Sequence, residues 1–120
     1  MPTGRMRRVN EAVRQVVSEH LAASVEDPRI GFVTVTGVEA APDLSHARVW
    51  VSVLGDESAR DQALEGLASS RGLLQAKLGG ELRMKRTPTL EFTYDQSIDR
   101  GMRMEELLGQ EATPRDEEGA

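Results

Sequence analysis

The 120-residue sequence predicts a single α+β domain in which helices cover one face of a three-stranded mixed sheet. Three observations support this fold class. Apolar residues recur at helical spacing near the N-terminus and again in the second half of the chain, and they alternate at every second residue in three shorter segments. These segments follow the order helix, strand, strand, broken helix, strand. The final strand–helix–strand unit predicts a right-handed crossover to a parallel neighbour, which makes the sheet mixed.

The first helix is expected over residues 4–25, where apolar side chains recur every three or four positions. Arg7, Glu11 and Arg14 fall on the opposite face, so only one side of the helix should pack. The helix should end before Asp27-Pro28, because proline disfavours a helical conformation in the residue before it. The apolar positions are Met6, Val9, Val13, Val16, Val17 and Leu21.

Residues 32–40 and 47–53 predict an antiparallel hairpin, since both are rich in valine and the second alternates valine with polar residues. Pro42 and Asp43 in the connection are turn formers. The alternation leaves one face of the sheet open to solvent, with Trp50 on that face. We expect Trp50 to be a partly buried packing residue. The alternative, a surface on which an RNA base stacks, stays open.

The second helical region is expected over residues 59–82, with Asp56 or Ser58 capping its start. It should break at Ser69-Ser70-Arg71-Gly72. Glycine costs about 1 kcal/mol in a helix relative to alanine, and serine competes for backbone hydrogen bonds. The candidate core positions are Leu64, Leu67, Leu74, Leu78 and Leu82.

The C-terminal third predicts a strand over residues 89–95 and a short helix over residues 97–108, interrupted at Gly101. The formal charge of −5 arises at this end of the chain. Residues 1–104 hold 14 basic and 14 acidic side chains, whereas residues 105–120 hold one basic and six acidic ones. We expect residues 1–108 to form the domain and residues 109–120 to be an acidic, disordered tail.

Composition excludes several function classes. The chain has no cysteine, which excludes disulfides and zinc–thiolate sites and fits a cytoplasmic protein. Residues 1–8 are basic and lack the apolar segment of a secretory signal, and no stretch approaches the ~18 apolar residues of a membrane span. Neither a glycine-rich phosphate loop nor metal-ligand spacing occurs. We therefore expect no cofactor and no metal.

The two histidines do not indicate a catalytic site. His20 lies near the apolar stripe of the first helix and is expected at the edge of the core. His46 follows Ser45, but neighbouring residues on a strand point to opposite faces, so a catalytic pair is not expected. The aspartates Asp43, Asp95 and Asp99 are interpreted as turn residues and caps. We therefore expect a protein that is not an enzyme.

Several short motifs, in order, resemble the ribosome-binding factor A family over residues 5–108. They lie at residues 5–10, 27–29, 42–47, 94–95 and 101–104. The resemblance implies a type II KH-like fold with the order helix, strand, strand, helix–kink–helix, strand. It also implies a monomer that binds the free small (30S) ribosomal subunit, assists late maturation of 16S rRNA and is often linked to cold adaptation. Ribosomal proteins and other assembly factors are further partners that it suggests.

The interhelical kink differs from that of ordinary KH domains, which grip nucleic acid with a Gly-x-x-Gly loop. No glycine pair in this chain has that spacing. The family has Ala-x-Gly at the kink, and the aligned residues here are Ser70, Arg71 and Gly72. Serine is small and should preserve the kink. We therefore expect recognition of folded rRNA shape rather than sequence-specific reading of a single strand.

Basic residues form three candidate RNA-binding groups, because phosphate contacts require only reach and positive charge. The first group follows the kink and comprises Ser70, Arg71, Gly72, Lys77, Arg83, Lys85 and Arg86. The second lies on the first helix and comprises Arg5, Arg7, Arg8 and Arg14. The third comprises Arg100 and Arg103.

Each group has a structural alternative. Cations after a helix can instead meet its negative dipole end, and Arg71 can be a surface residue beside a kink. Arg7 can pair with Glu11 on a solvated helix start. A protein–protein module that uses the acidic tail or an open sheet edge is the second function class that stays open.

Overall fold

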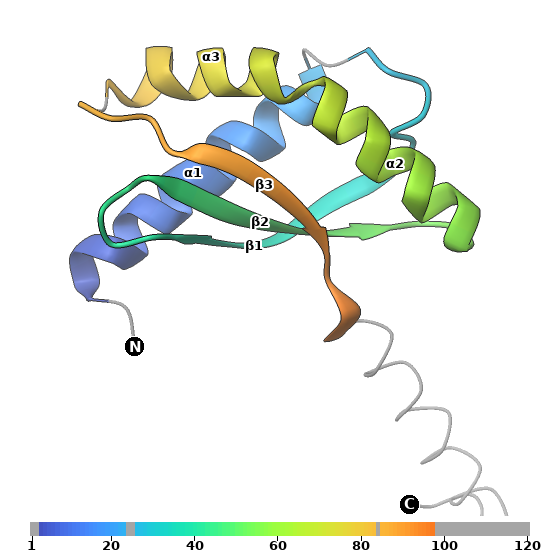
Figure 1. The fold of residues 1–120 in the computed structure, drawn as a ribbon, viewed down its shortest axis with the longest axis horizontal. Helices are drawn as coiled ribbons and strands as arrows, with labels where there is room; N and C mark the ends of the chain where they lie inside the picture. Colours follow the sequence, from blue (N-terminus) through green and yellow to red (C-terminus); the bar gives the residue numbers. More distant parts are fainter. Residues whose placement is uncertain (1–2, 24–25, 84, 98–120) are drawn as a thin grey trace, which may run out of the picture.

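The computed structural model describes residues 3–23, 26–83 and 85–97. Three helices cover one face of a three-stranded sheet, and the other face is open (Figure 1). Strand β1 pairs antiparallel with β2, and β2 pairs parallel with β3. The predicted α+β class, element order and mixed sheet are confirmed. The elements are α1 (Gly4–Ala23), β1 (Val33–Ala40), β2 (His46–Val53), α2 (Glu57–Ser69), α3 (Arg71–Leu82) and β3 (Thr89–Tyr94).

Helix α1 begins at a threonine cap and packs by one face. The Thr3 hydroxyl accepts a hydrogen bond from the backbone N–H of Met6 at 3.1 Å, which satisfies a donor that the first helical turn leaves unpaired. Val13, Val16 and Val17 are buried against the sheet and α3, as the apolar spacing predicts. In the described parts of the chain, no helix combines the length and apolar character that a bilayer crossing requires.

Side chains on the helix side of the sheet are buried, whereas those on the other side are exposed or half-buried. Val49 and Val51 in β2 are fully buried, whereas Arg48, which precedes both in the strand, is exposed. Trp50 is half-buried on the open face, which agrees with a packing role, and the Arg48 guanidinium lies 6.0 Å from its ring centre. Arg48 also approaches Glu91 of the neighbouring strand β3 at 3.9 Å. The charge of Arg48 is therefore partly offset.

The predicted helix break occurs at one residue, Ser70, which ends α2 and begins α3. Its backbone has φ −90° and ψ 0°, and its N–H donates to the carbonyls of Gly66 at 3.0 Å and Leu67 at 3.1 Å. The Ser70 side chain makes no capping hydrogen bond at the start of α3. The kink therefore does not need the hydroxyl, which is consistent with alanine at the same place in the family motif.

The loop of residues 26–32 is packed tightly on the last turns of α2. Ile30 is buried, and a methyl group added at Gly66 would lie 2.7 Å from Ile30 Cγ1 and 3.4 Å from Arg29 Cβ. Only a glycine lets the loop approach this closely. This contact holds the loop against the segment that leads into the kink.

Replacement of Gly66 by alanine is expected to destabilise the fold by about 1–3 kcal/mol, because the new methyl group would overpack the loop. Gly80 in α3 provides a matched control, since a methyl group there meets no atom within 4 Å. Gly80→Ala should stabilise the helix by up to about 1 kcal/mol. Urea unfolding of the two variants checks both signs, and equal effects would contradict the close-packing argument.

Candidate nucleic-acid interface

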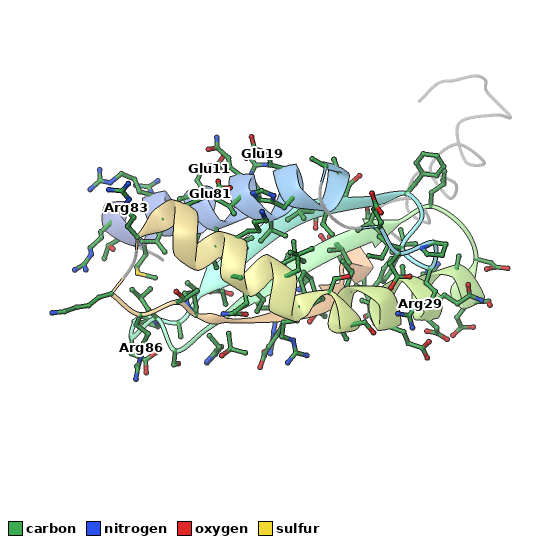
Figure 2. The ribbon with its side chains drawn as sticks, turned by 90° about the horizontal axis from the view of Figure 1, so that it is seen from above. Glu11, Glu19, Arg29, Glu81, Arg83 and Arg86 are labelled. Atoms are coloured by element: carbon green, nitrogen blue, oxygen red, sulfur yellow. The ribbon has the colours of Figure 1, made fainter. Side chains whose placement is uncertain are left out.

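One end of the elongated molecule brings together three segments that are far apart in the sequence. The start of α1, the turn between β1 and β2, and the connection from α3 to β3 all lie at this end (Figure 1). Arg83 and Arg86 extend from the connection there, as seen from above the helices (Figure 2). We call this region the basic end, defined by Arg5, Arg7, Arg8, Arg83, Lys85 and Arg86. Parts of the first and second predicted groups therefore lie at the same end of the molecule.

The connection that carries Lys85 and Arg86 is anchored on both sides. The backbone N–H of Thr89 donates to the carbonyl of Ser45 in the hairpin turn at 3.1 Å. The Gln75 side chain of α3 bonds both the Pro88 carbonyl and the Leu90 N–H, the latter at 3.2 Å. These bonds satisfy backbone groups at the edge strand β3 and hold the connection beside the hairpin.

The six cations of the basic end are exposed, and among the described residues none of them makes an ion pair. Asp43 in the hairpin turn is the nearby acid for Arg86. Hydrogen bonds from Ser45 lower the pKa of the Asp43 carboxyl, and the Arg86 charge lowers that pKa further. Repulsion among six like charges is unfavourable for the free protein and would be relieved by a polyanion.

Arg83 has a strained backbone. It has φ 50° and ψ 40°, the left-handed conformation that glycine usually supplies at the end of a helix. Its N–H donates to the Gly79 carbonyl at 3.2 Å, so the backbone of Arg83, rather than a side-chain contact, ends α3. An arginine in this conformation costs of order 1 kcal/mol relative to glycine.

Arg14 does not belong to the basic end. Its guanidinium forms a bidentate ion pair with Glu11, with Nε 2.9 Å from Oε1. This hydrogen bond lowers the pKa of Glu11. The alternative interpretation, a surface pair between Arg7 and Glu11, was wrong about the partner. Glu11 pairs with Arg14 instead.

The kink residues lie apart from the basic end. Helix α3 has 12 residues and is therefore about 18 Å long, and it separates Arg71 from Arg83. Arg71 and Gly72 are exposed, and Lys77 is half-buried midway along the helix. A methyl group at Gly72 would meet no atom within 4 Å, so packing does not require glycine there.

Arg29 lies beside the kink residues Ser70, Arg71 and Gly72, a position that its place in the sequence did not predict. Its Nη2 donates to the Ser69 hydroxyl at 3.1 Å, one residue before the kink. Asp27 and Arg29 belong to one of the motifs that carried the family resemblance, but spacing gave neither residue a role. Forty positions separate Arg29 from Ser69, so only the folded chain shows this contact.

An acidic cluster lies between α1 and α3. Glu19, His20 and Glu81 bring one potential ligand atom each to within 4.8 Å of one another, which makes them the residues of the described chain that could hold a metal. His20 lies at the edge of the core, as predicted, and its Nε2 bonds the Glu81 carboxylate. Glu19 and Glu81 line a groove between α1 and α3, beyond the basic end (Figure 2), and Arg14 in the same groove is paired with Glu11.

Ser45 and His46 lie within hydrogen-bond distance of each other, contrary to the expectation from strand alternation. The Ser45 hydroxyl lies 3.1 Å from His46 Nδ1, because Ser45 precedes β2 and is free of the strand alternation. The same hydroxyl lies 2.8 Å from Asp43 Oδ1, which also accepts the Ser45 N–H at 3.0 Å. The hydroxyl therefore donates within an aspartate-capped turn. Asp95 caps Ser97 in a similar way, as predicted.

Comparison with known proteins decides the family. The sequence model for ribosome-binding factor A matches residues 5–108. The chain belongs to this family. Ribosome-binding factor A of Geobacter sulfurreducens is 43% identical over 104 residues, which cover 87% of this chain and 88% of that protein.

Solved structures of the family agree with the fold. The crystal structure of ribosome-binding factor A from Thermus thermophilus has a TM-score of 0.67 at 30% identity and covers 74% of this chain and 94% of its own. The solution structure of a putative ribosome-binding factor A from Thermotoga maritima has a TM-score of 0.70 at 28% identity, covering 78% and 89%. A homology model of the Thermus protein, fitted into the cryo-EM map of a 30S complex, has a TM-score of 0.61 at 31% identity and covers 72% and 91%.

The family match extends past the described residues. It includes the predicted RNA-binding residues Arg100 and Arg103, and the motif at residues 101–104. These positions lie outside the described residues, together with Asp99, the predicted helix beyond residue 97 and the predicted acidic tail at 109–120.

Arg83→Gly is expected to stabilise the fold by about 0.5–1 kcal/mol, because glycine adopts the left-handed conformation without a steric cost. Arg86→Gly removes the same charge from a residue with ordinary backbone angles, so it should bring no such gain. Thermal unfolding of both variants checks the difference. A destabilised Arg83→Gly would show that the arginine side chain holds the end of α3.

Proposed function

We propose that this protein binds the free small (30S) ribosomal subunit and assists late maturation of 16S rRNA, as a cytoplasmic monomer and without catalysis. The observation that supports it most directly is the basic end, where six exposed cations from the start of α1 and the connection after α3 lie at the same end of the molecule. Family membership supports the choice of target, since a relative of 31% identity has been fitted into the map of a 30S complex.

The basic end is suited to phosphate rather than to bases. Lysine and arginine contacts to phosphate give most of the sequence-independent affinity for nucleic acid, by releasing condensed counterions. Base reading on single strands usually needs stacking aromatic rings. The chain has four aromatic residues, and Trp50 on the open face is half-buried beside Arg48 and its acidic neighbour Glu91. Recognition by charge and shape is therefore favoured.

The kink offers a second contact area about 18 Å from the basic end, at the other end of α3. Gly72 is exposed on the first turn of α3 and has no packing partner that requires glycine. A glycine there lets an RNA backbone approach the helix closely. We propose that Ser70, Arg71 and Gly72 form this area and that Lys77 lies between the two.

Contact with a ribosomal protein or another assembly factor is a second candidate, favoured by one observation. Phe32 and Leu54 are 79% and 76% exposed, and the Leu54 N–H donates to the Phe32 carbonyl at 3.1 Å, so the two lie together. Exposed apolar pairs of this kind suit protein partners. Loss of 30S binding on replacing both residues by serine, with the basic end intact, would favour this candidate.

Replacement of Arg83, Lys85 and Arg86 by glutamate is expected to release the protein from 30S subunits, because the new carboxylates would repel the RNA phosphates. The fold should be unaffected, because the three side chains are exposed. Co-sedimentation with purified subunits measures the effect, and circular dichroism verifies the fold. The single variants Arg48→Glu, on the open sheet face, and Lys85→Glu change the net charge equally. A larger loss of 30S binding for Lys85→Glu would show that the position of the charge decides the affinity. Unchanged co-sedimentation of the triple variant would contradict the assignment of these three residues to RNA contact.

Binding to 30S subunits is expected to weaken steeply with salt, because each phosphate contact contributes about 0.7–0.9 to the slope of log affinity against log salt concentration. Replacing the same three cations by glutamine should lower this slope by about 2–3. Binding isotherms at several potassium chloride concentrations measure it. A slope that does not change would mean that these side chains do not contact phosphate.

A further inference from the structure

The loop before β1 places an arginine beside the kink, on the helix side of the molecule (Figure 2). Arg29 is the second residue after Asp27 and packs along α2, where its Cβ would lie 3.4 Å from a methyl group at Gly66. Its Nη2 donates to the hydroxyl of Ser69, the last residue of α2. Two positions further on, Arg71 begins α3. The loop therefore adds a second cation to the kink.

The Asp27 carboxylate holds the guanidinium of Arg29 in a fixed orientation. Nε lies 3.0 Å from Asp27 Oδ1 and Nη2 lies 2.7 Å from Oδ2, and the Arg29 backbone N–H also donates to Oδ1 at 3.0 Å. The Asp27 side chain is 16% exposed and that of Arg29 is 41% exposed. The hydrogen bonds from Arg29 lower the pKa of Asp27, which keeps the carboxylate ionised.

This arrangement leaves one edge of the guanidinium for a ligand. Arginine has five N–H donors in a planar fork. Asp27 and Ser69 use Nε and Nη2, and within the described residues no hydrogen bond uses Nη1. A planar, pre-oriented guanidinium binds phosphate well, because less side-chain freedom is lost on binding.

The ion pair is not the only contact that holds the loop in place. Ile30 and Gly66 already lock the loop on α2 through a buried contact in which a methyl group cannot be accommodated. Exposed ion pairs add little to stability. A guanidinium that is fixed in orientation and partly exposed is suited to binding a ligand.

We propose that Arg29 binds a backbone phosphate of RNA beside the α2–α3 kink, together with Arg71, and that Asp27 is a positioning residue for its guanidinium. This inference rests on the proposed function, because the RNA is that of the 30S subunit. It adds a residue from a different part of the chain to the kink contact area.

The test compares Arg29→Gln with Arg48→Gln, which removes the same charge from the open sheet face. Affinity for purified 30S subunits is measured at several potassium chloride concentrations, at a temperature where thermal unfolding shows each variant to be folded. Arg29→Gln should weaken binding about tenfold and lower the salt slope by about 1. Arg48→Gln should change neither by more than about twofold. Arg29→Lys keeps the charge but loses the fork, so it should recover the slope and only part of the affinity.

Asp27→Asn separates positioning from net charge. Removing a negative charge should tighten RNA binding if only net charge matters, whereas loss of the positioning carboxylate should weaken it severalfold. Tighter binding would overturn the role of Asp27, and an Arg29→Gln variant that behaves like Arg48→Gln would overturn the phosphate contact while the proposed function stands. Absence of 30S binding by the wild-type protein would instead reject the proposed function.

Discussion

Parallel pairing of β2 with β3 requires the chain to return along the whole sheet before β3 can begin. Helices α2 and α3 make that return on the covered face, and the kink at Ser70 lets them follow the sheet in two straight segments. The return ends at the end of the molecule where α1 begins and the hairpin turns, so the connection with Lys85 and Arg86 shares that end with the start of α1 (Figure 1). The basic end is therefore a consequence of strand direction.

At two positions, the residue type is not the one that would make the local backbone conformation most stable. Arg83 takes a left-handed conformation that suits glycine, whereas Gly72 is in a helix without a packing reason to be glycine. Natural sequences depart from local preference mainly at functional sites. Both departures lie at ends of α3, in the two regions that the proposed function assigns to RNA. The close contact of Gly66 with Ile30 is different, because packing explains that glycine fully.

The structure also sorts cations that look alike in the sequence. Arg14 is paired with Glu11 and Arg48 approaches Glu91, so their charges are offset within the protein. Arg29 is paired too, but its carboxylate partner lies deeper than its guanidinium, which leaves the cation at the surface. The cations of the basic end make no ion pair in the described part of the chain. A formal charge of −5 therefore says little about the surface that meets RNA.

Within the described residues, sequence alone was enough for the helices, the strands and the kink, because apolar spacing, Pro28 and the serine–glycine segment act over a few neighbouring residues. The mixed sheet followed from the order of these elements and the preference for a right-handed crossover. The sequence also located most candidate cations, since charge is a property of the residue. Tertiary structure decided which of them are neighbours. The contacts of Arg29 with Ser69 and of His20 with Glu81 join residues 40 or more positions apart, and the start of α1 shares one end of the molecule with the connection after α3. Such contacts depend on how helices pack on the sheet, which local spacing does not encode.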